Sequence, residues 1–258
     1  MTGPHKIAFN TANLVARETG YRFHLTDWGK QEALTIARTD ETAWRDICRE
    51  ISQAGYTAVE IWKAHADASV MDPAKGRLWR KILSDNNLLP IGYAGAYSAE
   101  AVRVCEWLDI TAINGGLWGA TKLDEIEKLA RASGVRYNYE NHMETSATRI
   151  IEQIHGGSDV IGVALDTGWL GTQGVNALEA LDELGPLVRH VHVKDVRAAG
   201  GHETCQLGTG VVGIAELITA LKRRGYPGWY SWEDEPEDRN PMDIARTTRI
   251  WIERELAK

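Results

Sequence analysis

The sequence predicts a single (β/α)8 barrel, and three observations lead to that prediction. Eight short segments of strand character, each followed by a helical pattern, occupy the chain from end to end. The length of 258 residues suits one such barrel. No Gly-x-Gly-x-x-Gly follows the first segment, which argues against a doubly wound dinucleotide-binding sheet. No linker or repeat divides the chain, so residues 1–258 are expected to form one domain.

The predicted strands are short and mostly apolar. The first is followed by a long polar stretch, about residues 11–40, which is expected to be a lid or substrate loop because connections of this length usually carry function. The apolar run Val160–Asp166 is typical of a strand that is buried on both faces of a parallel sheet. In chain order the predicted strands cover residues 7–10, 58–62, 89–94, 111–115, 135–140, 160–166, 187–193 and 228–232.

Several predicted helices begin at residues that cap helix N-termini or end at glycine. Asp72 precedes Pro73, which combines an N-cap with proline in the first helical position. Gly134 ends the helix that Thr121-x-x-Asp124 opens. In chain order the helices are expected to begin near Asp40, Asp72, Ser98, Thr121, Glu144, Asn176, Ile214 and Ile244.

Composition excludes several classes of protein. A formal net charge of −7 argues against a nucleic-acid partner, which needs a basic face for phosphates. Three widely spaced cysteines without a Cys-x-x-Cys pair suit free thiols in a reducing compartment. No apolar run is long enough for a membrane span and the start carries no signal-peptide pattern, so we expect a soluble cytoplasmic protein.

Polar residues stand at the ends of several predicted strands, where such barrels carry their active sites. In chain order they are Glu60, Glu140, His142, Asp166, His190, His192, Lys194, Asp195 and Glu233. Strands five to eight therefore offer three carboxylates and an imidazole that could converge on one divalent cation. The oxygen-rich set favours Mn²⁺, with Mg²⁺, Co²⁺ or Zn²⁺ as alternatives. Such an ion polarises a carbonyl, and a ligand carboxylate or a nearby histidine could take the α-proton.

Each of these residues also has a structural interpretation. A single glutamate at a strand end is more often solvated or ion-paired than bound to a metal. His190 shares a face with His192 only if their strand is regular. Glu60 and Asp195 are as well suited to supporting other groups as to binding an ion. The presence of several charged residues at successive strand ends favours a metal site, because burying several charges without partners is costly.

Aromatic and polar residues at the same strand ends are candidates for substrate contact. Trp118 and Trp169 follow predicted strands, where flat rings can stack on a sugar or an aromatic aglycone. Glu60 and Lys194 are the polar residues that we expect at the substrate. Trp44 and Trp79 stand at helical spacing, which indicates packing instead.

Four motifs together resemble the xylose-isomerase-like sugar phosphate isomerase/epimerase superfamily of TIM barrels. They are Tyr-Glu-Asn-His (139–142), Ala-Leu-Asp-Thr-Gly-Trp (164–169), His-Val-His-Val-Lys-Asp (190–195) and Trp-Glu-Asp-Glu (232–235), with Gly-Thr-Gly (208–210) before the last unit. The resemblance covers essentially the whole chain and is more specific for fold and metal site than for substrate.

The resemblance implies particular roles. Its metal ligands match Glu140, Asp166, His192 and Glu233, and its epimerases exchange substrate protons through carboxylates that match Glu140 and Glu233. His142 matches a frequent active-site histidine. Many members carry His where this chain has Trp169, which argues against an ordinary ketose 3-epimerase. In the branch related to C-glycoside deglycosidase large subunits, a histidine in the Glu-x-His position is the base, and a smaller partner subunit is needed.

The sequence thus predicts a divalent-metal-dependent isomerase or epimerase that abstracts a proton α to the carbonyl of a keto-sugar or sugar derivative. One alternative is a lyase that eliminates the aglycone of a 3-oxo-glycoside. Others are a zinc endonuclease-like enzyme, which the acidic charge disfavours, and a non-catalytic sugar-binding subunit. We expect a homo-oligomer, since exposed apolar barrel surfaces commonly drive association.

Overall fold

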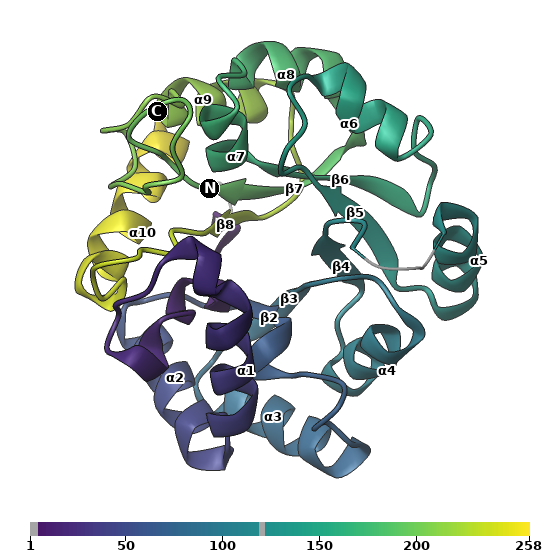
Figure 1. Ribbon diagram of the computed structural model, residues 1–258, viewed down its shortest axis with the longest axis vertical. Helices are drawn as coiled ribbons and strands as arrows, with labels where there is room; N and C mark the ends of the chain where they lie inside the picture. Colours follow the sequence, from purple (N-terminus) through teal and green to yellow (C-terminus); the bar gives the residue numbers. More distant parts are fainter. Residues whose placement is uncertain (1–4, 119–121) are drawn as a thin grey trace.

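The chain folds into a closed barrel of eight parallel strands surrounded by helices, as the sequence predicts (Figure 1). The computed structural model describes residues 5–118 and 122–258. Each strand pairs with its neighbours in sequence, and the last pairs with the first. The strands are β1 (Ile7–Asn10), β2 (Ala58–Trp62), β3 (Leu89–Ala94), β4 (Ala112–Gly115), β5 (Arg136–Glu140), β6 (Ile161–Asp166), β7 (Val188–Val193) and β8 (Tyr230–Trp232).

Four helices begin at the predicted caps. The side chains of Asp40, Asp72, Ser98 and Asn176 each accept a backbone N–H of the first helical turn. The helices are α1 (Trp28–Arg38), α2 (Glu41–Gln53), α3 (Pro73–Asp85), α4 (Ala99–Leu108), α5 (Leu123–Ser133), α6 (Ala147–Gln153), α7 (Thr167–Thr172), α8 (Ala177–Leu184), α9 (Ile214–Arg223) and α10 (Met242–Ala257). In the described ranges, none of these helices combines the length and apolarity that crossing a membrane requires.

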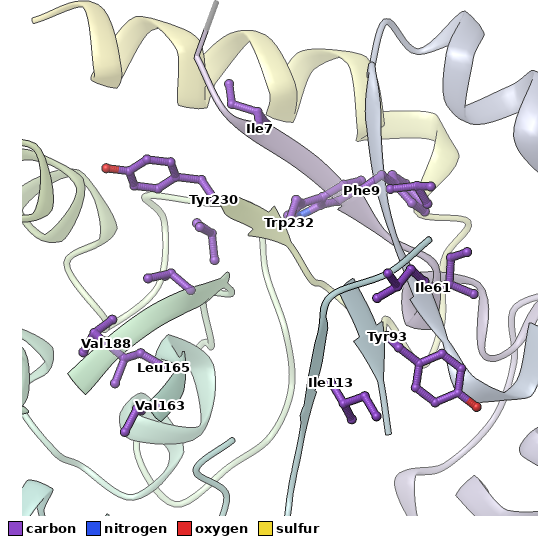
Figure 2. Packing of buried hydrophobic residues seen from close by; sticks show 14 of the residues in the cluster. Ile7, Phe9, Ile61, Tyr93, Ile113, Val163, Leu165, Val188, Tyr230 and Trp232 are labelled. Atoms are coloured by element: carbon purple, nitrogen blue, oxygen red, sulfur yellow. The ribbon is translucent and has the colours of Figure 1, made fainter. Parts of the chain in front are cut away.

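The hydrophobic core lies between the strands and the helices. Phe9, Tyr230 and Trp232 belong to the strand residues that pack outward in this layer (Figure 2). Phe9 meets the rings of Tyr56 and Trp232 edge-on, each with 5.4 Å between ring centroids. The alternate residues of the strands face the barrel axis, and near the C-terminal ends they are polar. The barrel interior beneath the strand ends is therefore polar, with Asn114, Asn138 and Ser231 among its buried residues.

Three segments differ from the sequence prediction. Residues 11–40, expected to be a lid or substrate loop, contain three short 3₁₀ segments and the helix α1, which was not predicted. The helix α7 directly after β6 was not predicted. Helix α6 begins after Ser146 rather than at Glu144, whose carboxylate instead accepts the hydroxyl of Tyr139 and the backbone N–H of His142. The predicted cap Thr121 lies outside the described residues.

Candidate active site

Four side chains from four consecutive strand ends meet at one point. Candidate ligand atoms of Glu140, Asp166, His192 and Glu233 all lie within 4.8 Å of one another, and all four residues are buried. Nδ1 of His192 is 2.7 Å from a carboxylate oxygen of Glu140 and 2.8 Å from one of Glu233. These four side chains lie close together because the closed barrel brings the C-terminal ends of β5 to β8 to one rim.

The cluster concentrates negative charge in a buried place. Burial lowers the pKa of His192, but the carboxylates of Glu233, Glu60 and Glu140 outweigh burial and raise that pKa well above its ordinary value. Burial would also raise the pKa of Glu233, yet His192 and Lys194 bring it below its ordinary value. The carboxylates thus require positive charge close by.

One atom of the cluster is suited to a cation. Asp166 is the last residue of β6 and also the N-cap of α7, so its Oδ1 accepts the backbone N–H of Trp169 at 2.9 Å. Its Oδ2 is buried and has no hydrogen-bond partner among residues 5–118 and 122–258. Burial and the charges of Glu233 and Glu140 raise the pKa of Asp166 to about 6, against the opposing effect of Lys194. An oxygen-rich donor set in which one buried carboxylate oxygen accepts no hydrogen bond from the described residues fits a divalent cation.

Glu60 lies beneath the cluster and is not among the residues that line the pocket above it, so its position differs from the expected substrate contact. The carboxylate is fully buried and lies 2.9 Å from Nε2 of His190 and 3.0 Å from Nε2 of His192. It also accepts hydrogen bonds from Asn114 and Ser231, each at 2.6 Å. His190 therefore faces the barrel axis beside His192. Nδ1 of His192 points to the cluster while Nε2 donates to Glu60, an arrangement that fixes the orientation of a ligand histidine.

Replacing Glu60 by Gln should weaken Mn²⁺ binding by about 10- to 100-fold, because the amide has one acceptor oxygen and leaves some of the donors around it unpaired. Calorimetric titration of chelator-treated protein with Mn²⁺ measures the effect. Glu255→Gln is the matched control, since Glu255 is also buried but pairs with Lys258 at 2.7 Å on α10. An unchanged dissociation constant in the Glu60 variant would show that this carboxylate does not support the ligand.

Lys194 and Asp195 are likewise buried below the pocket surface. Nζ of Lys194 pairs with Glu235 and lies 3.5 Å from Glu233 and 3.6 Å from Asp166. Its charge therefore offsets that of the carboxylates, and its position differs from the substrate contact that we expected. Asp195 holds the following loop, because its Oδ2 accepts the N–H groups of Gly208 and Gly210, both at 2.9 Å. A Cβ at position 210 would collide with the backbone and with Asp195 itself, which explains the second glycine of Gly-Thr-Gly.

A pocket of about 660 Å³ opens above the cluster. Its floor carries Glu140, His192 and Glu233, and its walls are largely tryptophan. The predicted contact residues Trp118 and Trp169 both line it, as does the predicted base His142. The remaining lining residues are Asn10, Ala12, Leu25, Trp28, Glu32, Trp62, Lys63, Ala94, Gly95, Ala96, His202 and Glu235. Pockets of this size and character bind small molecules.

Several pocket residues were missed by sequence reasoning. Trp28 and Glu32 belong to α1, and the polar composition around them gave no helical signal. His202 lies in the loop between β7 and α9, and a loop has no sequence periodicity that predicts where its side chains point. Glu235 follows the predicted Glu233 by two residues and stands in the quoted motif, which is the signal that could have found it.

Comparison with known proteins agrees with the barrel fold. The family model described as xylose isomerase-like TIM barrel matches residues 48–255. Inosose dehydratase 1 of Bacillus cereus is 29% identical over 156 residues, which are 52% of this chain and 52% of that protein. The chain thus spans about half the length of the curated relatives that it matches.

Two solved structures share the fold. AsbF of Bacillus anthracis, described as a probable 3-DHS dehydratase, superposes with a TM-score of 0.68 at 14% identity over 95% of this chain and 98% of its own. An L-ribulose 3-epimerase gives a TM-score of 0.68 at 17% identity, covering 98% of this chain and 95% of its own. At these identities the likeness shows the fold alone.

Proposed function

The chain belongs to the xylose isomerase-like TIM-barrel family, and from that premise we propose that it is a metal-dependent lyase acting on a cyclic keto-sugar or ketocyclitol. A base takes the proton α to the carbonyl, the released electron pair forms a carbon–carbon double bond, and the β-oxygen substituent leaves with a proton. The observation that carries the proposal is one pocket whose floor holds three of the four cluster residues, Glu140, His192 and Glu233, and whose wall holds a histidine of suitable tautomer.

His142 is the proposed base. Its Nδ1 lies 3.0 Å from the backbone carbonyl of Glu140, which can only accept, so Nδ1 carries the hydrogen and Nε2 keeps a free electron pair. Nε2 lies 3.9 Å from the carboxylate of Glu140, on the pocket side of the cluster. The rings of Trp118 and Trp169 hold the imidazole, at 4.6 and 5.3 Å between ring centroids. This ring is therefore placed to accept a proton from a substrate in the pocket.

Glu140, Asp166, His192 and Glu233 are the residues that would hold the cation, with Mn²⁺ favoured by the donor set. When bound, such an ion supplies Lewis-acid polarisation of the substrate carbonyl, which acidifies the neighbouring C–H bond. The protein contributes the orientation of His192 through Glu60 and the tryptophan rings that line the pocket.

An epimerase is the second candidate. Glu140 and Glu233 reach the pocket floor from β5 and β8, and two proton carriers on different strands suit removal and return of a proton on opposite faces of a carbon. The first step is shared with the lyase, and only the fate of the enolate differs.

Segment 11–40 is proposed to cover the substrate, because Ala12, Leu25, Trp28 and Glu32 line the pocket. Replacing Trp28 by Ala should raise KM by about 10-fold with little change in kcat, since the ring contacts Trp62 edge-on and forms an apolar wall away from the reacting atoms. Steady-state kinetics measures the effect, and Trp107→Ala on α4 is the control outside the pocket. A loss confined to kcat would contradict the assigned position.

Product analysis tests the proposed function. Protein loaded with Mn²⁺ is incubated in D₂O with inosose, L-ribulose and a methyl 3-oxo-glucoside, and products are followed by NMR and mass spectrometry. Elimination gives an unsaturated ketone together with water or methanol. Epimerisation gives a deuterated stereoisomer and releases nothing. Absence of both deuterium uptake and product from all three would refute the shared enolisation step on this substrate class.

A further inference from the structure

One wall of the pocket is a row of four rings that come from four parts of the chain. Trp118 follows β4, His142 follows β5, Trp169 lies on α7 and His202 lies in the loop after β7. The centroid distance is 4.6 Å from Trp118 to His142, 5.3 Å from His142 to Trp169 and 4.3 Å from Trp169 to His202. Two imidazoles thus stand on either side of Trp169, and the base proposed above accounts for only one of them.

The loop that carries His202 is braced on both sides of the histidine. Val196 and Thr204 form an antiparallel bridge, and the N–H of Arg197 donates to the carbonyl of Glu203 at 3.0 Å. The hydroxyl of Thr172 on α7 donates to the carbonyl of Gly201 at 3.0 Å. These bonds fix the backbone before and after His202, so the position of its ring against Trp169 is built into the fold.

The imidazole of His202 has one buried polar atom without a hydrogen-bond partner among the described residues. Nε2 of His202 is buried and finds no hydrogen-bond partner within the described ranges. Burial, together with the positive charge of Lys194, lowers the pKa of His202 to about 3, so the imidazole is neutral at physiological pH. Buried polar atoms are nearly always hydrogen-bonded. The residue that carries this atom lines the pocket, as do Glu233 and Glu235.

We propose that His202 is a substrate-contacting residue, whose Nε2 forms a hydrogen bond with an oxygen of the keto-sugar on the Trp169 side of the pocket. The proposal rests on the proposed function and extends it by naming a second imidazole for the same substrate. A neutral ring suits this task, because it can form a hydrogen bond with a hydroxyl, or with an oxygen on which negative charge develops, without adding charge to the site.

Two variants separate a hydrogen bond from packing. His202→Phe keeps a ring against Trp169 and removes the polar atoms, whereas His202→Gln loses the ring and places an amide close to where Nε2 lies. Binding of inosose, L-ribulose and a methyl 3-oxo-glucoside is measured by calorimetry with Mn²⁺-loaded protein in a His142→Asn background, in which turnover is expected to be blocked. His155→Gln, on an exposed turn, is the matched control.

The proposal expects the Phe variant to weaken binding of the best probe by about 10-fold or more and the Gln variant to keep most of the affinity. Equal binding by the Phe variant overturns the proposal, and so does an equal loss in the Phe and Gln variants, which indicates that only the ring matters. Binding of none of the three probes by the background protein refutes the proposed substrate class and the inference with it. That outcome is distinguishable, because it is seen before any change at His202.

Discussion

Replacing Asp166 by Asn is expected to raise the melting temperature of chelator-treated protein by about 2–8 °C and to abolish the further rise that Mn²⁺ gives the parent. Without a cation, the ionised Asp166 is buried near the charges of Glu140 and Glu233. Its Oδ2 accepts no hydrogen bond in the described part of the chain, and the ammonium of Lys194, at 3.6 Å, offsets the repulsion only in part. The rise of its pKa from 3.8 to about 6 corresponds to about 3 kcal/mol against the ionised form, of which the neutral amide recovers a part.

The pH dependence has a definite sign. Because the pKa of Asp166 in the folded state lies above the unfolded value, ionisation weakens the native state as pH rises from about 4 to 6, and the penalty is complete above that range. The gain from Asn should therefore be largest at pH 7 and shrink as the pH falls toward 4. Thermal unfolding followed by circular dichroism at several pH values, with and without Mn²⁺, measures both effects.

Asp195→Asn is the matched control for this experiment. Asp195 is equally buried, but its carboxylate is satisfied by the N–H groups of Val196, Gly208, Gly210 and Val212. Its replacement should lower the melting temperature whether or not Mn²⁺ is present. A lower melting temperature of the Asp166 variant in chelator, or an undiminished response to Mn²⁺, would contradict the proposed cation site.

Replacing His142 by Asn is expected to slow deuterium uptake into substrate by about 10²- to 10⁴-fold, with the metal content unchanged. The Asn amide can still donate to the carbonyl of Glu140 as Nδ1 does, so the change removes mainly the basic Nε2. His142 is not one of the four residues of the cluster, and a metal-site variant should behave differently by losing the ion as well.

The measurement combines exchange rates from NMR with metal analysis of the same samples. His155→Asn serves as the control, because this histidine lies on an exposed turn. Retention of parental exchange by the His142 variant would transfer the role of base to Glu140 or Glu233 and favour the epimerase. Loss of bound metal would instead place His142 among the groups that hold the ion.

The fold was largely predictable because its signals are local. Each of the eight strands was expected within about two residues of its observed bounds, since apolar runs between capped helices specify their own ends. The caps Asp40, Asp72 and Asn176 act as expected because they satisfy N–H groups within a few residues. The missed helix α1 buries the polar residues Gln31 and Thr35, so the spacing of its apolar residues gave no sign of a buried face.

The sequence by itself determined which residues could form the cluster. Side chains alternate along a strand, and the ends of parallel strands meet at one rim of a closed barrel, so strands five to eight were expected to bring three carboxylates and an imidazole together. The family resemblance then selected Glu140, Asp166, His192 and Glu233 before their distances were known. The tertiary structure alone decided that Glu60 and Lys194 lie beneath the pocket, because burial and hydrogen bonding to distant strands select their partners. It also decided that Trp28 and His202 reach the pocket. Contacts between residues far apart in the chain determine where these segments lie, and the local sequence pattern does not predict such contacts.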